Sequence, residues 1–473
     1  MFRKMNAFQQ AGIVLFKTPW SRKGLTRVTI ILLSVCVFVG GCATYKPQPL
    51  PVTADLVTPP RLTANIDRFA CASLKPYPFD AQNGLDMTEI AILAALNNPD
   101  LMALRQKAGV ARAQLFAARL LPDPQVTVRL DYPTVKRADL FTAYEYGLNY
   151  DLNYFVTRRV SIEEAAAAAA KVDLEILWQE WQVIQKARTL FVHAKFEEDM
   201  LNVLKQIQRL YANRYARSSK ALREGNLTLD VTGTDLTAKI DSDTQVNDME
   251  QVLNKTRHEL NALVGISPDA KIRLVHPAAA PCILDERELK QAVRDMVERR
   301  PDLLALRAGY ESQEAKVHKA VLNQFPALNV GIKMSSDTSD VHTTGHETVL
   351  TLPFFNRNRG KIAVEKATRQ QLRQEYQARI AQAYGQADLI WTRQRLLIKQ
   401  LHQLQRYLPT LEKMVEKARR AYADQNIAPI TYINMENTLA NKRLKAIHLM
   451  QGLWETAIAL DALLARHGIT VTH

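Results

Sequence analysis

The sequence predicts a mainly α-helical protein made of two long helical hairpins, with a smaller β portion of the kind that crosses a membrane. Three observations support this fold class: a long stretch without helix-breaking residues, a duplication of the whole pattern, and short segments of alternating polarity. The chain of 473 residues is 47% hydrophobic and contains only 17 glycines. Such a composition suits helices better than sheets.

The longest helix is expected in the first half of the chain. There is no proline between Pro133 and Pro268, and no glycine from Arg158 to Glu224. Within this run apolar residues recur at three- and four-residue steps, the period of a seam between packed helices. They are Leu174, Leu177, Trp181, Ile184, Met200, Leu204, Ile207 and Tyr211. The run forms a rod of roughly 100 Å, which alone would also fit a solvated coiled coil.

Each long helix is expected to reverse into a second helix. The first reverses at Gly225-Asn226 into a helix over Thr228–Val264, because glycine and asparagine suit a tight turn between antiparallel helices. The second pair is a helix over Arg357–Asp424, a reversal at Gln425-Asn426 and a return over Pro429–Arg466. Pro409 lies inside the second long helix and is expected to kink it.

The hairpins belong to a duplication of the whole pattern. Asn98-Pro99-Asp100-Leu101 matches Arg300-Pro301-Asp302-Leu303, and Leu260-Asn261-Ala262-Leu263 matches Leu460-Asp461-Ala462-Leu463. Each half is predicted to contain a short helix, a medium helix, two strands, a long helix and a returning helix. This unit is too long for a solenoid of small repeats. The predicted boundaries are 85–265 for the first repeat, 266–284 for the linker, 285–466 for the second repeat and 467–473 for a C-terminal tail.

Residues 1–41 are interpreted as an export signal. A basic region precedes the apolar segment Val28–Val39, which is shorter than the about 20 residues that span a bilayer comfortably. It ends in Val39-Gly40-Gly41-Cys42, which resembles a bacterial lipobox and makes Cys42 the candidate acyl acceptor; the alternative is a signal with an incidental cysteine. Ala43 is not the aspartate that retains such lipoproteins at the inner membrane, so the outer membrane is expected. Residues 42–84 are rich in proline and are expected to form an extended arm.

Four segments alternate apolar and polar residues as strands do. They are Gln125–Tyr132, Tyr144–Tyr154, Leu328–Ser335 and Val349–Leu352. Their aromatic residues and polar faces fit strands that cross a bilayer around a wet lumen, although two soluble hairpins would show the same alternation. Because open sheet edges are not tolerated in lipid, four spanning strands require two, three or more copies of the chain to close a barrel.

Over roughly residues 85–466 the chain resembles the TolC-type outer-membrane efflux proteins, in particular their lipoprotein branch. The resemblance rests on the duplicated Asn/Arg-Pro-Asp-Leu segments, on Leu352-Pro353-Phe354-Phe355-Asn356, and on the reversals at Gly225-Asn226 and Tyr422–Asn426. It implies a trimer with a twelve-stranded barrel in the outer membrane and a twelve-helix α-barrel in the periplasm. The short helices 86–97 and 285–299, with the linker, would belong to an equatorial belt.

The resemblance implies the outer-membrane channel of a tripartite efflux or type I secretion system, which performs no chemistry and needs no cofactor. The reversals would form a periplasmic tip that docks an adaptor protein, which joins the channel to an inner-membrane pump. The candidate docking residues are Gly225, Asn226, Leu227, Gln425, Asn426 and Ile427. The alternative is a lipid-anchored periplasmic coiled-coil scaffold without a pore.

The tip departs from the family pattern at several positions. Gln425 stands where the family often has glycine, and Thr431 and Asn434 stand where it often has acids. The candidate gate residues are Arg419, Arg420, Tyr422, Asp424 and Asp230; the alternative is that these are ordinary solvated residues at helix ends.

Other function classes find no support in the sequence. Lys and Arg are spread among many acids without a basic, aromatic-interleaved patch, so nucleic-acid binding is not expected. No catalytic constellation is present. Solvated side chains are expected for the single helical histidines His193, His258, His318 and His448. A surface loop is expected to hold His342 and His346 with Asp337 and Asp340, and a plain exposed loop explains these residues better than a metal site.

Beyond Cys42 the sequence contains two cysteines, Cys71 and Cys282. An exported chain would carry this even pair into a compartment where disulfides form. Each precedes the first short helix of its half. We expect either a disulfide that joins the N-terminal arm to the linker, or two separate thiols.

Overall fold

The computed structural model describes residues 45–52, 84–135, 137, 139–277 and 280–466. The chain divides into two compact units, residues 1–55 and 56–473. In the first unit the described residues 45–52 are exposed and form neither helix nor strand. The predicted export signal, Cys42, Cys71 and the tail 467–473 lie outside the described residues.

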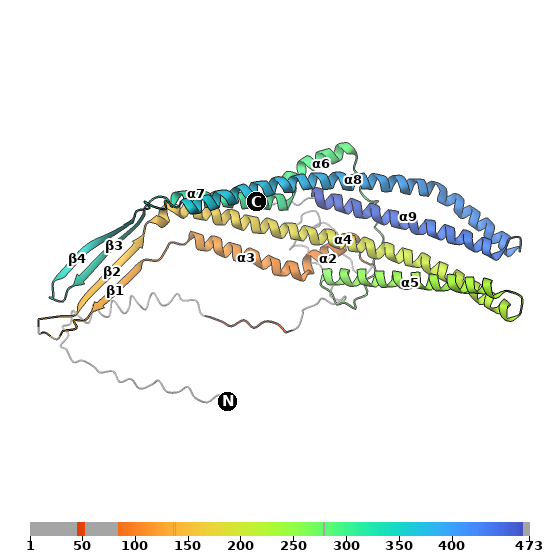
Figure 1. The fold of residues 1–473 in the computed structure, drawn as a ribbon, viewed down its shortest axis with the longest axis horizontal. Helices are drawn as coiled ribbons and strands as arrows, with labels where there is room; N and C mark the ends of the chain where they lie inside the picture. Colours follow the sequence, from red (N-terminus) through yellow and green to blue (C-terminus); the bar gives the residue numbers. More distant parts are fainter. Residues whose placement is uncertain (1–44, 53–83, 136, 138, 278–279, 467–473) are drawn as a thin grey trace, which may run out of the picture. The chain divides into compact units, whose positions relative to one another are not determined.

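The second unit contains the same series of elements twice, as the duplication predicts (Figure 1). The first half contains α2 (Met87–Asn97), α3 (Pro99–Arg119), β1 (Gln125–Asp131), β2 (Ala143–Asp151), α4 (Asn153–Arg223) and α5 (Leu229–Val264). The second half contains α6 (Glu286–Arg299), α7 (Pro301–Leu322), β3 (Ala327–Ser336), β4 (His342–Thr351), α8 (Arg359–Ala423) and α9 (Pro429–Leu464). The long helices α4 and α8 have 71 and 65 residues, so each is roughly 100 Å long.

The short helices α2 and α6 begin at the same kind of cap. Before α2, the Asp86 side chain accepts hydrogen bonds from two backbone N–H groups, and the Glu89 carboxylate accepts one from the backbone N–H of Asp86 at 2.9 Å. Before α6, Asp285 and Glu288 form the same reciprocal pair. Such a capping box satisfies backbone donors that a helix start leaves unpaired. The predicted short helices are confirmed to within one residue.

The four strands form one antiparallel sheet in the order β1–β2–β3–β4. β3 and β4 pair along their whole length, from Ala327 opposite Thr351 to Ser336 opposite His342. β1 and β4 are therefore the two edges of the sheet, and every residue of these two strands is exposed in a single chain. The four predicted strands are present, and the two edges of the sheet, β1 and β4, are open for pairing.

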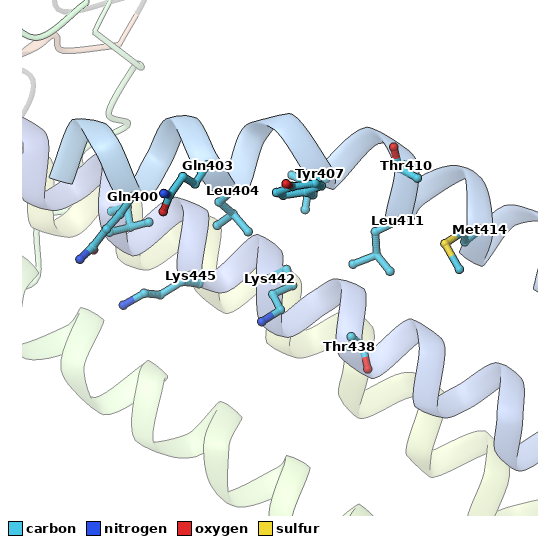
Figure 2. A pocket seen from close by; sticks show the side chains of 12 residues that line it. Gln400, Gln403, Leu404, Tyr407, Thr410, Leu411, Met414, Thr438, Lys442 and Lys445 are labelled. Atoms are coloured by element: carbon cyan, nitrogen blue, oxygen red, sulfur yellow. The ribbon is translucent and has the colours of Figure 1, made fainter. Parts of the chain in front are cut away.

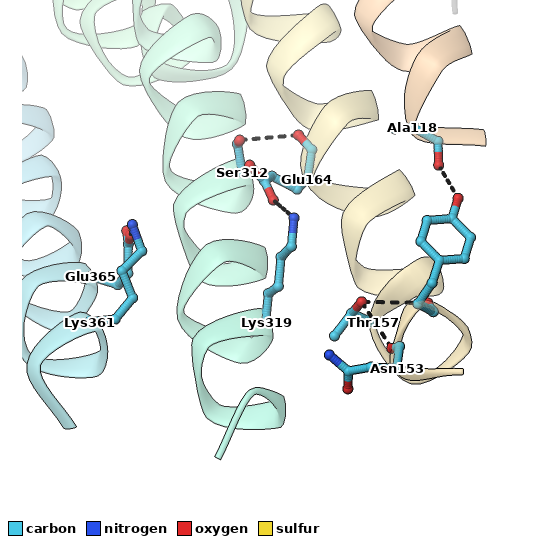
Figure 3. A network of polar contacts seen from close by, with 9 residues as sticks. Ala118, Asn153, Thr157, Glu164, Ser312, Lys319, Lys361 and Glu365 are labelled. Carbon is cyan, nitrogen blue, oxygen red and sulfur yellow. Dashed lines mark hydrogen bonds and ion pairs between the residues drawn. The ribbon is translucent and has the colours of Figure 1, made fainter. Parts of the chain in front are cut away.

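The predicted end of the second strand is wrong. β2 stops at Asp151 instead of Tyr154, because α4 begins earlier than the alternation suggests. The Asp151 carboxylate accepts a hydrogen bond from the backbone N–H of Asn153 at 2.8 Å. The Tyr154 hydroxyl donates to the carbonyl of Ala118, at the end of α3, at 3.1 Å (Figure 3). These contacts draw the residues after Asp151 into the helix.

The predicted loop around His342 and His346 is also wrong, since both residues belong to β4. The ring of His342 lies across the sheet from Tyr144, with 3.1 Å between Nδ1 and the phenol oxygen. Its Nε2 is 3.5 Å from Oδ1 of Asp340 in the turn before the strand. β4 pairs with β3 along its whole length. The strand therefore starts at His342, several residues earlier in the chain than the alternating segment Val349–Leu352.

Beyond the sheet the long helices lie side by side (Figure 1). Near the sheet the packing order is α3–α4–α7–α8, and near the reversals it is α5–α4–α9–α8. α8 is therefore outermost on one side near the sheet and near the reversals, with α6 packed on it at mid-length, and α3 and α5 are outermost on the other side. Among the described residues, none of the helices is both long enough and apolar enough to cross a membrane.

The helix boundaries follow the predicted breakers closely. α5 begins at Leu229, and α9 begins at Pro429, in the first turn, where a missing N–H is harmless. α8 contains Pro409 and remains helical on both sides of it, and its ribbon curves gradually over this half (Figure 1).

Burial is deepest where α2 packs against α4 and α5. Ile90 and Leu93 of α2, Phe191 of α4 and Val264 of α5 are fully buried, and they belong to one cluster with Trp454 of α9. This cluster joins the first hairpin to the second at mid-length.

A polar network joins α7 to the long helices near the sheet (Figure 3). Glu164 of α4 accepts from Lys319 at 3.3 Å through its carboxylate and from Ser312 at 3.1 Å through its backbone carbonyl. On the other side of α7, the buried amide of Gln313 donates to the carboxylate of Glu365 in α8. α7 is thereby held between α4 and α8.

Candidate functional site

The two reversals at the far ends of the long helices share one backbone geometry. After α4, the N–H groups of Gly225 and Asn226 donate to carbonyls of the last helical turn at 3.0 and 2.8 Å. After α8, the N–H groups of Gln425 and Asn426 do the same at 3.1 and 2.8 Å. Both turns are Schellman motifs, in which the residue after the cap is left-handed. The duplication therefore extends to the individual hydrogen bonds of its turns.

Gln425 occupies a backbone conformation that favours glycine. Its φ is +60°, close to the +76° of Gly225. For an L residue a left-handed conformation costs roughly 1–2 kcal/mol. The second reversal keeps the geometry of the first and carries an energetic penalty that the first does not.

Within one chain, the predicted gate residues do not form a single network. Arg419 and Arg420 both pair with Glu416, one turn earlier in the same helix, at 3.0 and 3.2 Å, and their hydrogen bonds hold the pKa of Glu416 below its usual value. Asp424 is the C-cap of α8 and is exposed. Asp230 lies in the first turn of α5, where a hydrogen bond from the Thr side chain of the N-cap lowers the pKa of its carboxyl.

Tyr422 is the predicted gate residue that connects the two hairpins. Arg217 of α4 donates to its hydroxyl at 2.8 Å. Its ring stacks on Tyr432 of α9, with centroids 5.2 Å apart and planes 8° apart. The Tyr432 hydroxyl donates to Glu436 at 2.8 Å; burial and this hydrogen bond raise the pKa of Tyr432 to about 12. The sequence analysis missed Arg217 and Tyr432, although a tyrosine on each side of the reversal was a signal for the stack.

A buried ion pair lies within the first hairpin near its tip. Nη2 of Arg214 in α4 is 2.5 Å from Oδ1 of Asp235 in α5, and their side chains are only 14% and 4% exposed. Removing one partner of such a pair leaves an uncompensated buried charge, which is strongly destabilising. The pair therefore fixes α5 on α4 just above the reversal.

A cavity of about 470 Å³ lies between the two hairpins at this end. Apolar side chains and the polar groups described above line the cavity. The lining residues include Leu227, Val231, Ile433, Arg214, Arg217 and Tyr422. Leu227, a predicted docking residue, is half-buried here, and Ile427 is half-buried at the second reversal.

A second groove, of about 750 Å³, runs between α8 and α9 further from the tip (Figure 2). Leu404, Tyr407, Leu411 and Met414 line it from α8, and Thr438, Lys442 and Lys445 line it from α9. Nothing in the sequence analysis predicted this groove.

The prediction of solvated histidines is wrong for His193. Its Nε2 is 2.8 Å from Oε1 of Glu455 in α9, and the two side chains are 32% and 29% exposed. The hydrogen bond to Glu455 raises the pKa of His193, and the same contact lowers the pKa of Glu455. His258, His318 and His448 are exposed, as expected.

A metal site was the less favoured interpretation, and a disulfide between Cys71 and Cys282 was one of two alternatives. In the described part of the chain no three His, Cys, Asp or Glu side chains are grouped so as to hold a metal ion. Cys282 is exposed, and its sulfur lies 3.5 Å from Nη1 of Arg466. Its predicted partner Cys71 lies outside the described residues, so the disulfide stays a prediction.

Comparison with known proteins shows similarity to one family. Residues 292–466 match the family described as outer membrane efflux protein. The chain is 21% identical to the probable outer membrane lipoprotein SilC of Salmonella typhimurium, over 88% of this chain and 92% of that protein. It is 22% identical to the cation efflux system protein CusC of Escherichia coli K12, over 88% of this chain and 95% of that one.

Solved structures share the fold. A CusC structure matches 89% of this chain and 99% of its own, with a TM-score of 0.66 at 17% identity. The outer membrane channel CmeC of Campylobacter jejuni matches 89% of this chain and 94% of its own, with a TM-score of 0.69 at 13% identity. The chain has the fold of the TolC-like outer membrane efflux channels, and its residues 292–466 match the outer membrane efflux protein family. The predicted fold class and the predicted outer-membrane location are thereby confirmed.

The shared fold relates the elements of this chain to those of the TolC-like channels. Channels of this fold have a β-barrel portion and an α-barrel portion that extends into the periplasm; the sheet of this chain corresponds to the first and its helical hairpins correspond to the second. The family consists of outer membrane efflux channels rather than enzymes, which supports the channel and not the scaffold.

Proposed function

We propose that three copies of this chain form a passive duct that carries solutes from the periplasm across the outer membrane, as the exit channel of a tripartite efflux or type I secretion system. In this duct the β1 edge of each sheet pairs with the β4 edge of the next copy. Both edges are open in a single chain, and unpaired backbone groups in lipid would cost several kcal/mol each. The transport energy comes from an inner-membrane pump, and the chain itself performs no chemistry.

The observation that carries this proposal is the pair of matching reversals at the end of the array opposite the sheet (Figure 1). We assign adaptor docking to Gly225–Leu227 and Gln425–Ile427. Their backbones are fixed by the same hydrogen bonds, and each presents one half-buried apolar side chain beside exposed polar residues. Three copies would present six such turns around the periplasmic mouth.

We assign the gate to the contact between Tyr422 and Arg217, just above the reversals. This hydrogen bond and the stack of Tyr422 on Tyr432 tie the second hairpin to the first. A hairpin that swings outward must break the hydrogen bond to Arg217, while the stack lies within its own hairpin. Lipidation of Cys42 would anchor the periplasmic side of the chain to the outer membrane.

Single-channel recording in planar bilayers tests the duct, with the oligomer mass measured in native lipid. We expect discrete conductance steps from a trimer. A stable monomer without conductance would overturn the duct and leave the lipid-anchored scaffold.

Aspartate substitutions at the two tips test the docking assignment. Leu227→Asp combined with Ile427→Asp should abolish efflux in cells, while the membrane level and the oligomer remain unchanged. The matched control is Val135→Asp, which places the same charge on an apolar side chain that is 61% exposed in the loop between β1 and β2. Unchanged efflux in the tip variant would contradict docking at these turns.

A further inference from the structure

α5 and α8 are the outermost helices on opposite sides of the array near the reversals (Figure 1). α5 packs against α4 and α2, and α8 packs against α9, α7 and α6. In a ring of identical copies, the free side of α8 in one copy therefore meets the free side of α5 in the next, a head-to-tail contact that closes by rotation. This inference rests on the proposed oligomeric duct.

The free side of α8 is a basic stripe. Between residues 391 and 423 the helix carries eight Lys and Arg residues and two acids. Five of the basic residues recur at steps of four and seven, so they share one face of the helix. They are Arg395, Lys399, Arg406, Lys413 and Lys417, and all five are exposed. Arg395 and Lys399 line a pocket together with Asp285 and Glu286 at the start of α6. The ion pairs in the described part of this half of the array involve other residues, so Arg406, Lys413 and Lys417 have no ion-pair partner there.

The free side of α5 is an acidic stripe. This helix carries seven acids against three Lys and Arg residues. Asp235, Asp243 and Glu250 pair with basic residues within the first hairpin. The other four recur at steps of eleven and seven, which keeps them on one face. They are Asp230, Asp241, Asp248 and Glu259, and all four are exposed.

The two stripes match in register as well as in sign. Both reversals lie at the same end of the array (Figure 1), so position along each helix measures depth from the tip. At about 1.5 Å per residue, Lys413 lies about 15 Å from the end of α8, and Asp241 lies about 18 Å from the start of α5. Arg406 and Asp248 lie at about 26 and 29 Å by the same measure.

Arg395 and Glu259 also lie at similar depths, about 42 and 45 Å, but Arg395 lies beside Asp285 and Glu286 of its own chain. The offset stays at about 3 Å in all three cases, which the length of a Lys or Arg side chain spans easily. One like-charged contact interrupts the series, because the exposed Lys255 of α5 comes to about the depth of Lys399.

We propose that the periplasmic half of the seam between copies is a row of ion pairs that join α8 of one protomer to α5 of the next. The pairs are Lys413 with Asp241 and Arg406 with Asp248. Exposed pairs of this kind are individually weak and are screened by salt. They therefore fix the register and direction of assembly more than its strength, as charges do at other interfaces.

Cysteine cross-linking tests the register. The variant Lys413→Cys with Asp241→Cys, treated in membranes with a short bifunctional thiol reagent, should give a covalent trimer on a denaturing gel. The mismatched variant Lys413→Cys with Glu259→Cys should give only the background of Lys413→Cys alone. Measuring the oligomer mass in native lipid separates the stripe pairing from the oligomeric duct on which it rests. A stable trimer that cross-links equally in both pairs, or in neither, overturns the stripe pairing and leaves the duct intact, whereas a monomer overturns both.

Charge exchange tests the pairing chemistry. Lys413→Glu with Arg406→Glu should lower the temperature at which the trimer dissociates, with a larger drop at low salt than at high salt. Adding Asp241→Lys and Asp248→Lys should restore it. Lys255→Glu should raise the dissociation temperature, because it converts the like-charged contact into an attractive one. Failure of the restoring pair, or a lower dissociation temperature in Lys255→Glu, would overturn the proposal.

Discussion

Exchanging the residues at Gly225 and Gln425 isolates the energetic effect of a left-handed turn, because both occupy the same position in two equivalent motifs. Gln425→Gly removes a backbone penalty of roughly 1–2 kcal/mol. The greater freedom of glycine in the open chain offsets about 0.5–1 kcal/mol of this gain. We therefore expect the closed second turn to gain about 0.5–1 kcal/mol. Gly225→Gln should destabilise the first turn by a similar amount, since a Cβ at Gly225 meets no atom within 4 Å and the penalty is purely conformational.

Hydrogen exchange at the turn amides measures these changes. Because 1.4 kcal/mol is tenfold in an equilibrium constant, exchange at Asn426 should slow about two- to fivefold in Gln425→Gly, and exchange at Asn226 should accelerate as much in Gly225→Gln. Gly233→Gln is the matched control, because Gly233 is helical with open space around its Cβ. Equal exchange in the parent and both variants would refute the claim that the left-handed residue sets turn stability.

Three further predictions concern the contacts between helices. Tyr422→Phe keeps the aromatic stack but removes the hydroxyl that accepts from Arg217, a loss of about 0.5–1.5 kcal/mol, so channel open time in bilayers should rise several-fold. The raised pKa of His193 means that its pairing with Glu455 stabilises the fold fully below the unfolded value of about 6.5 and is lost as pH rises through the folded value. The unfolding temperature should therefore fall as pH rises above about 6.5, and His193→Gln should remove that slope. Asp235→Asn should lower the free energy of unfolding by about 3–5 kcal/mol in denaturant titrations, because it leaves a buried arginine uncompensated.

The sequence was most informative where structure depends on local signals. Breaker-free runs, apolar periodicity and the Gly225-Asn226 turn predicted the hairpins to within a few residues. The start of α4 was missed because the alternation Tyr150, Leu152, Tyr154 continues the strand pattern past its true end. A tertiary contact decides there, since the Tyr154 hydroxyl binds a carbonyl at the end of α3.

The location of the candidate site could be predicted from the sequence, but the residues that contact one another there could not. The reversals follow from their own residues, whereas Arg217 and Tyr422 are 205 positions apart in the sequence. The contact of His193 with Glu455 joins two halves of the chain in the same way. Apolar periodicity shows which face of a helix is buried, but it does not show which helix will cover that face.

The two halves retain the same backbone hydrogen bonds at positions where their side chains have diverged. Asn98 caps α3 with its side chain, whereas the equivalent Arg300 instead binds Asp302 and lies over Trp178. At the reversals the same divergence leaves the first hairpin with an unstrained Gly225 and a buried ion pair, and the second with a strained Gln425. The tip of the second hairpin is held to the first through an exposed hydrogen bond at Tyr422. If the two tips separate when the duct opens, that hydrogen bond must break, and the strained turn at Gln425 makes the α8–α9 tip the more easily deformed of the two.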